Sequence, residues 1–267
     1  MKTFKIITAL TLVSSLFVAC KKETEEDHDH TTPVATTPVV TTPVATTGGL
    51  TFKFTNSVGV KPMVLNTDSY VNNTDSFTVS TFNYFISNIK LTATDGTVFS
   101  ETESYHLLKA DDAASLQFSF ANVPVKNYSS ITFTIGVDSL RNVSGAQTGA
   151  LDPASGMFWT WNSGYIMAKF EGYSPKSTNT TKLVEFHLGG FKGTNSVLKT
   201  VTLPLTTNAT ITGTITPVVE INADLAEWFA PNAISFAMTS SVTMPGAMAK
   251  KIADNYANMF TVTKVTN

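Results

Sequence analysis

The most constraining feature of this sequence is its single cysteine, Cys20, in a chain of 267 residues that begins with an export signal. Lys2 and Lys5 precede an apolar run over residues 6–19. That run is too short to span a bilayer as a mature helix and is typical of a secretory signal peptide. Exported domains often rely on disulfides, and none can form within this chain. The folded part must therefore be stabilised by burial in a large core.

The end of the apolar run indicates a lipid anchor. Residues 16–20 read Leu-Phe-Val-Ala-Cys and place a small residue directly before the cysteine, as lipoprotein processing requires. We therefore expect residues 1–19 to be a signal peptide and Cys20 to become the lipid-bearing first residue. The alternative is an ordinary signal peptide cleaved elsewhere, with Cys20 discarded or left as a free thiol. The position of the only cysteine favours the lipid anchor.

Residues 20–49 predict a lipidated tether outside the fold. Residues 21–30 are polar or charged throughout, which leaves nothing to build a core. Acids that closely follow a lipidated cysteine resemble the export tag that carries some bacterial lipoproteins to the outer leaflet. We therefore expect an outer-membrane protein that faces the cell exterior. His28 and His30 offer loose metal chelation, although a solvated charged tether is the simpler interpretation.

A Thr-Thr-Pro-Val repeat follows over residues 31–47, with prolines at regular intervals. Proline prevents a helix and favours an extended, polyproline-like spacer, so the repeat predicts a stalk. Gly48 and Gly49 then release the chain into the domain, which we place at residues 50–267.

The domain is predicted to be all-β, with two antiparallel sheets packed as a β-sandwich. Thr, Val, Ile and Phe are plentiful, charged residues make up only 14%, and long stretches of helical periodicity are nearly absent. About 220 residues suit one such domain. The formal net charge of -2 gives no basic footprint for nucleic acid, so neither DNA nor RNA is expected as a partner.

Alternation and turn residues give the expected elements. Asp95-Gly96 predicts a tight hairpin turn, and residues 138–155 predict a long loop before an aromatic stretch. Short C-terminal helices are expected after Asp224, as an N-cap, and from Gly246. The predicted strands are residues 50–54, 76–94 (one strand or two), 97–99, 105–108, 116–120, 130–137, 165–172, 182–188, 197–203, 211–221 and 261–265.

The aromatic stretch, residues 156–172, holds two of the three tryptophans, a tyrosine, two methionines and three glycines. Ile166, Ala168 and Phe170 fall on one face of a predicted strand, with Lys169 and Glu171 on the other. Aromatic residues crowded at the start of a strand are usually core, and that interpretation suffices for any one of them.

The sequence contains no Gly-x-Ser-x-Gly, phosphate-loop or His-Glu-x-x-His pattern, so we expect no enzymatic activity. A carboxylate pair for glycoside hydrolysis stays open for Glu171, Glu185 and Asp138, although nothing in their spacing selects them.

Four segments together resemble the MbnP-like family. They are Met157-Phe158-Trp159-x-Trp161-x-x-Gly164-Tyr165 with Glu171-Gly172, Phe186-His187-Leu188-Gly189, Ser87-Asn88-Ile89-Lys90-Leu91 with Asp95-Gly96, and Ile135-Gly136-Val137-Asp138 before Arg141-Asn142. The resemblance implies an extracytoplasmic copper-binding β-sandwich. In the best-known branch it also implies a di-haem peroxidase-like partner that oxidises a tryptophan of the aromatic motif. That branch carries four cysteines and a histidine where this sequence has Val143.

Two functional hypotheses follow. In the first, copper is bound by His187, because imidazole suits copper, and Met157 or Met167 adds the thioether sulfur that suits Cu(I). His106, the other histidine of the domain, is a weaker candidate ligand, and Trp159, Trp161 and Tyr165 are the motif aromatics beside the site. The second hypothesis is a metal-free cell-surface binding or structural module on the same fold. In it, His187 is a hydrogen-bonded strand residue and the methionines fill the core.

The lipid anchor predicts that Cys20→Ser yields an unlipidated protein, because the thioether to the lipid needs the cysteine sulfur. Metabolic labelling with a radioactive fatty acid checks this. The wild-type chain should carry the label, and label retained on the Cys20→Ser chain would refute the anchor.

Overall fold

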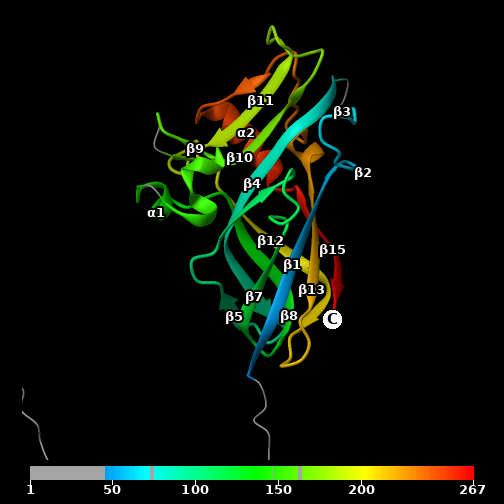
Figure 1. The fold of residues 1–267 in the computed structure, drawn as a ribbon, viewed down its shortest axis with the longest axis vertical. Helices are drawn as coiled ribbons and strands as arrows, with labels where there is room; N and C mark the ends of the chain where they lie inside the picture. Colours follow the sequence, from blue (N-terminus) through cyan, green and yellow to red (C-terminus); the bar gives the residue numbers. More distant parts are fainter. Residues whose placement is uncertain (1–45, 73–74, 146, 162–163) are drawn as a thin grey trace, which may run out of the picture. The chain divides into compact units, whose positions relative to one another are not determined.

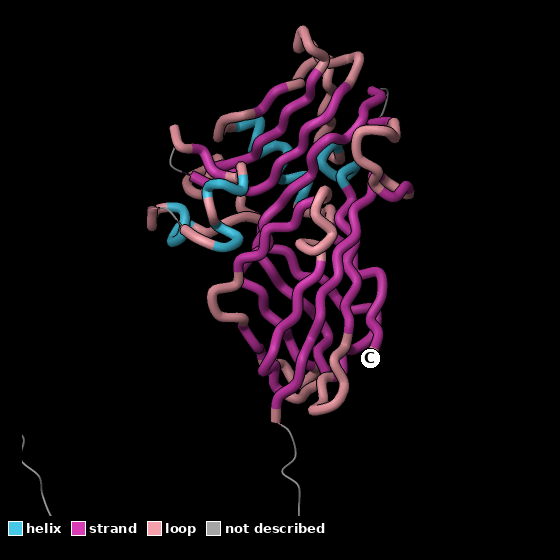
Figure 2. Tube along the Cα trace, in the orientation of Figure 1, coloured by secondary structure: helices cyan, strands magenta, loops and turns pink. Residues whose placement is uncertain are grey.

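A computed structural model describes residues 46–267 apart from residues 73–74, 146 and 162–163. This part of the chain forms two β-sheets with a few short helices, which confirms the predicted all-β sandwich (Figures 1 and 2). Cys20, His28, His30 and most of the Thr-Pro stalk lie outside the described residues. Among the residues that are described, no helix is long and apolar enough to cross a membrane.

The smaller sheet has five strands within the described residues. It follows the order β15-β13-β1-β2, and β7 also pairs with β1. Its strands are β1 (Thr47–Val58), β2 (Lys61–Pro62), β7 (Gln117–Pro124), β13 (Val218–Asp224) and β15 (Phe260–Thr266).

The larger sheet follows the order β12-β8-β4-β10-β11-β14. Four further strands pair with β4 or β10 off this path. The strands are β3 (Tyr70–Asn72), β4 (Asp75–Ala93), β5 (Val98–Ser100), β6 (Tyr105–Lys109), β8 (Asn127–Ile135), β9 (Phe158–Trp159), β10 (Gly164–Tyr173), β11 (Leu183–Gly189), β12 (Lys199–Thr210) and β14 (Ser241–Val242).

The helices are short, as Figure 2 shows in cyan. They are α1 (Ser139–Asn142), η1 (Gly149–Leu151), η2 (Pro153–Ser155), η3 (Leu225–Phe229) and α2 (Ala247–Tyr256). The first three lie in the predicted long loop. The two predicted C-terminal helices are confirmed: the Asp224 carboxylate accepts a hydrogen bond from Ala226 N at 2.8 Å, and α2 begins directly after Gly246.

Two strand pairings contradict the antiparallel prediction. β1 pairs with β13 in parallel, and so does β11 with β14. Each pair joins segments far apart in the sequence, so no hairpin turn imposes an antiparallel direction on them. In contrast, the tight turn at Asp95-Gly96 sets the direction of the two strands that it joins. β4 and β5 are antiparallel there, as predicted.

Two element boundaries also differ from the predictions. β1 already begins at Thr47, so Gly48 lies within the strand and does not precede it. A glycine is needed at this position, because a Cβ there would come within 2.2 Å of the Thr212 carbonyl oxygen. The turn after β12 lies too close to β1 for a side chain at this position, so the glycine is a packing residue. Residues 211–217 are not a strand: Thr212 Oγ1 accepts hydrogen bonds from the backbone N–H groups of Thr214 and Ile215 and forms a turn.

The strand β4 lies near the centre of the larger sheet, and its residues 75–93 form one strand where 76–94 were predicted as one or two. Its residues 82–87 are all buried although a strand presents alternate residues to opposite faces. On the inner face the Tyr84 ring lies 5.4 Å from that of Phe260 in the smaller sheet. On the outer face the Phe85 ring lies 5.7 Å from that of Tyr165. Both faces of β4 are therefore covered by other parts of the chain.

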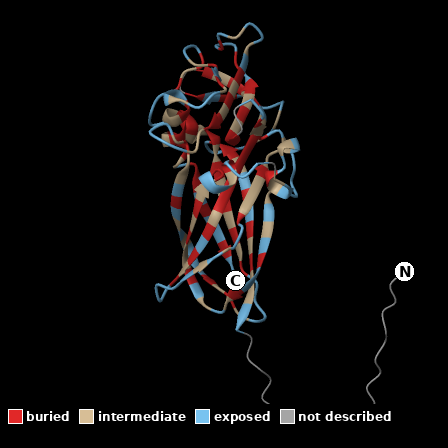
Figure 3. Ribbon diagram, turned by 90° about the vertical axis from the view of Figure 1, so that its left-hand side faces the viewer, coloured by how far each residue is buried: buried red, intermediate tan, exposed pale blue. Residues whose placement is uncertain are grey.

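Aromatic rings fill the space between the layers, where Figure 3 shows buried residues in red. Phe77 contacts Phe170, Phe229 and Phe236 edge-on, with ring centroids 5.4 to 5.8 Å apart. Phe170 is on the inner face of β10, as its alternation predicts. The large aromatic core provides the burial that a chain without disulfides requires.

Candidate functional site

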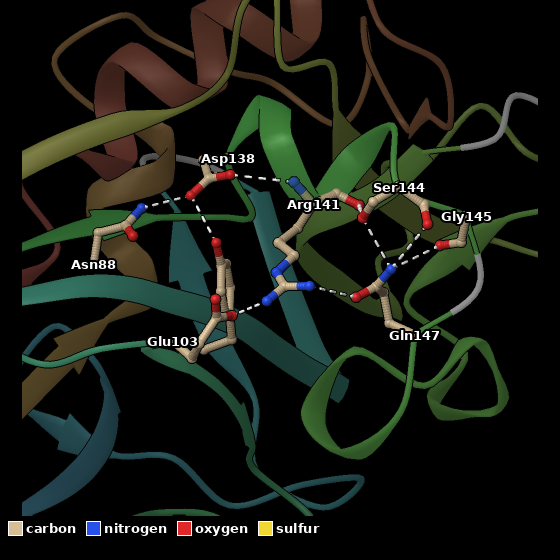
Figure 4. A network of polar contacts seen from close by, with 8 residues as sticks. Asn88, Glu103, Asp138, Arg141, Ser144, Gly145 and Gln147 are labelled. Carbon is tan, nitrogen blue, oxygen red and sulfur yellow. Dashed lines mark hydrogen bonds and ion pairs between the residues drawn. The ribbon is translucent and has the colours of Figure 1, made fainter.

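The described residues between Gly136 and Tyr165 cover part of the outer face of β4, and polar contacts attach them there. Ser87 Oγ donates to the carbonyl of Gly136 at 2.8 Å, and Asn88 Nδ2 donates to Asp138 Oδ2 at 2.9 Å (Figure 4). Asn88 has a φ of 54°, a left-handed conformation that asparagine tolerates better than most residues. Two of the motifs quoted from the sequence therefore meet in space.

Asp138 organises the start of this segment. Its carboxylate caps helix α1 by accepting from Arg141 N at 3.3 Å, and it accepts from the Tyr105 hydroxyl at 2.8 Å. Burial alone would raise the pKa of Asp138, but the hydrogen bonds from Asn88, Tyr105 and the helix backbone outweigh it and hold that pKa below its usual value. Asp138 is thus a charged capping residue.

The side chain of Arg141 ties the next turn together. Its guanidinium contacts the carboxylate of Glu103 and donates to Gln147 Oε1 at 3.2 Å (Figure 4). Gln147 Nε2 in turn donates to Ser144 Oγ at 2.9 Å and to the carbonyl of Gly145 at 3.2 Å. These contacts link Arg141 to Glu103 on one side and to Gln147 of the loop on the other.

Asn142 joins the loop to the aromatic motif. Its amide nitrogen donates to the carbonyls of Val137 and Asp138, and its Oδ1 accepts from the backbone N–H of Tyr165 at 2.9 Å. The Tyr165 hydroxyl then donates to the carbonyl of Leu151 at 2.6 Å. Because Asn142 is buried and both its side-chain nitrogen and its side-chain oxygen form hydrogen bonds, it fixes where Val143 and the start of β10 lie relative to each other.

The aromatic motif rests directly on the Phe-His-Leu-Gly motif of β11. The indole of Trp159 lies so close to Gly189 that a Cβ there would come within 2.2 Å of the Trp159 ring. Trp161 packs against Trp159 with ring centroids 5.4 Å apart, yet is 61% exposed. Gly189 is therefore required by the tryptophan that covers it.

A cleft of about 760 Å³ opens beside Trp159. Its aromatic lining residues are Phe158, Trp159, Tyr165 and Phe191, and Val143 lines it as well. Lys192 is the only charged residue among the described lining residues, with its ammonium 5.5 Å from the Phe191 ring centroid. The volume of the cleft lies within the range of small-molecule sites. A largely apolar lining with a few polar groups is also typical of such sites.

His187 lies outside this cleft, on the outer face of β11. Its Nε2 is 2.7 Å from Glu171 Oε1, and Thr81 Oγ1 donates to Glu171 Oε2 at 2.9 Å. The hydrogen bond from His187, followed by those from Thr81 and the charge of Lys169, lowers the pKa of Glu171 to about 2 despite its partial burial. The histidine is thus part of a charge cluster with a carboxylate as partner.

The structure does not bring the other candidate ligands to His187. Met157 is fully buried in the core, and Met167 Sδ accepts a hydrogen bond from Val137 N at 3.1 Å. His106 stacks on Phe118 between the sheets, with centroids 3.7 Å apart, and bonds to Glu101. In the strand register His187 aligns with Asn83 and His106 with Ile86, an odd offset that places the two imidazoles on opposite faces.

These residues do not fit copper. A copper site needs imidazole or sulfur donors around one point. The described residues contain no group of three or more His, Cys, Asp or Glu side chains that could hold a metal ion. Neither histidine nor methionine is among the described lining residues of the cleft, and Val143 lines it where the resemblance places the histidine of the cysteine-rich branch. No chemical step through copper is therefore derived.

Several cleft residues were not predicted from the sequence. Phe191, Lys192 and Asn195 follow β11 and Pro245 precedes α2, and all four line the cleft. The available signal was the Gly189-Gly190 pair, since Gly190 has a φ of 115° that turns the chain back over the motif.

The sequence matches the MbnP family over residues 47–245. Among solved structures, MbnP from Methylosinus trichosporium is similar with 14% sequence identity and a TM-score of 0.47, over 76% of this chain and 84% of that chain. No curated protein matches.

The fold and the site define a two-sheet β-sandwich protein with an aromatic cleft on the outer face of its larger sheet. The family match covers well over half of the sequence, and the chain belongs to the MbnP family.

The contact between Gly189 and Trp159 predicts that Gly189→Ala displaces the indole. We expect a loss of about 1–3 kcal/mol in the free energy of unfolding, typical of overpacking. Urea denaturation measures the loss, and tryptophan fluorescence reports the displacement. Gly246→Ala is the matched control, because a Cβ there meets nothing within 4 Å. Equal stability of Gly189→Ala and the wild type would contradict the contact.

The lowered pKa of Glu171 predicts a pH-dependent contribution to stability. A carboxylate with a depressed pKa stabilises the fold above its unfolded value of 4.5 and loses that contribution as pH falls towards about 2. Because the side chain is partly exposed, Glu171→Gln should cost about 1–2 kcal/mol at neutral pH. The difference in the free energy of unfolding between Glu171→Gln and the wild type should become smaller below pH 4.5 when both are denatured with urea. The exposed Asp68→Asn is the control, and a gap for Glu171→Gln that is constant with pH would refute the prediction.

Proposed function

We propose that this chain is an outer-membrane lipoprotein, anchored at Cys20, whose MbnP domain binds a small ligand in the aromatic cleft without catalysing a reaction. The signal peptide and the acidic, Thr-Pro-rich segment after Cys20 support the location. The observation that carries the function is the cleft itself, which combines aromatic walls with one ammonium group and contains no carboxylate among its described lining residues. A ligand with a flat apolar body and an anionic group complements these features.

The cleft is built as a binding site in a further respect. The polar contacts of Asp138, Arg141 and Asn142 fix the loop that forms one wall. A preorganised wall lowers the entropy that binding costs.

Copper binding is the second candidate, favoured by family membership and by the single imidazole of His187 on the outer face of the sheet. The resemblance also implies a di-haem peroxidase-like partner that acts on a motif tryptophan. Of the two motif tryptophans, Trp161 is the more accessible, since Trp159 is buried. With Glu171 as the partner of His187, any such site is short of soft donors.

Anilinonaphthalene sulfonate, a flat aromatic anion, tests the cleft. Its fluorescence should rise and saturate on titration with the folded chain. Phe191→Ala should weaken binding about threefold to tenfold, the worth of one aromatic contact, because the Phe191 ring lines the cleft. Tyr173→Ala is the matched control, because Tyr173 is an exposed aromatic residue of β10 that is not among the described lining residues of the cleft. Equal weakening by both variants, or no saturable binding, would refute the cleft as the site.

Titration with Cu(I) and Cu(II) separates the two candidates. If the chain has the metal-free function, the His187→Ala variant and the wild-type chain should give the same copper titration and the same affinity for the dye. Loss of micromolar copper binding in His187→Ala, with dye binding unchanged, would instead establish the second candidate.

A further inference from the structure

One loop supplies the polar side chains of the aromatic cleft that the protein itself does not use. Four of the described lining residues carry an amide, hydroxyl or ammonium group: Asn142, Tyr165, Lys192 and Asn195. The Asn142 amide bonds to the backbone, and the Tyr165 hydroxyl donates to the carbonyl of Leu151 at 2.6 Å. The side-chain polar groups of Lys192 and Asn195 form no hydrogen bond or ion pair with the described residues. Both belong to the loop of residues 190–197.

The backbone of this loop is held in place between β11 and β12. Val197 N donates to the carbonyl of Gly190 at 2.9 Å and ties the two ends together. Gly190 has a φ of 115°, and a Cβ there would come within 3.3 Å of Pro245 Cβ, so the loop lies close against the segment before α2. Residues 192–195 are exposed. A loop with fixed ends and free polar side chains can bind a ligand without the cost of ordering its backbone.

The charge of Lys192 decides which polar group the loop complements. Its ammonium lies 5.5 Å from the centroid of the Phe191 ring, which lines the cleft as well. No carboxylate is among the described lining residues, so none of them neutralises this ammonium. One ammonium balances one negative charge, and a doubly charged group such as a phosphate monoester would keep one charge uncompensated. The loop therefore complements a singly charged oxyanion.

We propose that residues 190–197 form an anion-recognition loop, in which Lys192 and Asn195 bind the carboxylate or sulfonate of a singly charged ligand whose apolar body lies on the aromatic lining. Lys192 is the specificity-determining residue, because its charge selects an anionic ligand over a neutral one of the same shape. The amide nitrogen of Asn195 supplies a second donor for the oxyanion. This inference rests on the proposed function of the cleft and adds which residues choose the ligand.

Two dyes that differ in a single sulfonate group isolate the contribution of the charge. N-phenyl-1-naphthylamine is neutral, and anilinonaphthalene sulfonate is its sulfonated form. In fluorescence titrations of the full chain, Lys192→Gln should weaken binding of the anionic dye about threefold to fivefold, the upper part of the range for an exposed ion pair. Binding of the neutral dye should stay the same. Higher ionic strength should weaken binding of the anionic dye to the wild type but not to Lys192→Gln.

Two further lysine variants complete the comparison. Lys192→Arg keeps the charge and should restore binding of the anionic dye. Lys176→Gln is the matched control, because Lys176 is an exposed lysine that is not among the described lining residues of the cleft. All variants share the chain before residue 46, so dye bound there cancels when the variants are compared.

Phe191→Ala separates a failure of the loop from a failure of the cleft. It should weaken binding of both dyes, because the Phe191 ring lines the cleft whatever the charge of the ligand. If it does so, but Lys192→Gln weakens both dyes equally, weakens neither, or acts no more strongly than Lys176→Gln, the cleft remains the site and the anion-recognition loop is overturned. If Phe191→Ala affects neither dye, the dyes bind elsewhere, and the proposed function and this inference are both overturned.

Discussion

The burial of both faces of β4 is the constraint on which the rest of the structure depends. Its inner face is covered by the smaller sheet, and its outer face can be covered only by chain brought from elsewhere. Residues 136–165 supply that cover, although they contain little regular structure. Without a second cysteine to form a disulfide, the cover is fixed by buried hydrogen bonds from Ser87 and Asn142. Such bonds are strong in a low-dielectric interior when every partner is satisfied.

The aromatic cleft is a consequence of how this cover ends. At Trp159 the covering segment meets the end of β11, and the absence of a side chain at Gly189 lets the indole lie against the backbone. The rest of the cleft is lined by residues that follow β11 and by a residue that precedes α2. These residues surround an open cleft and do not form a packed layer. Residues that carry the family resemblance therefore build part of the wall, and their chemistry there is that of packing and hydrogen bonding.

Much of the fold could be predicted from the sequence, because strand alternation and caps are local signals. Phe170 was placed on the correct face, and the cap at Asp224 and the hairpin at Asp95-Gly96 follow from the chemistry of single side chains. The role of Gly48 and the parallel pairing of β1 with β13 could not be predicted, since both depend on distant segments. The same limit applies to the candidate site, where Phe191 and Pro245 come from stretches without any pattern.

The positions of the sulfur and imidazole donors explain why the described cleft lining offers no soft ligand to a metal ion. His187 is paired with Glu171, so a metal there would have to displace a short charged hydrogen bond. The buried thioethers of Met167 and Met259 accept hydrogen bonds within the core. Among the described methionines, Met238, Met244 and Met248 have exposed side chains, and Pro245 of the same segment lines the aromatic cleft. The described lining of the cleft therefore offers a ligand aromatic surface and one ammonium group, whereas the thioethers and the imidazoles lie outside it.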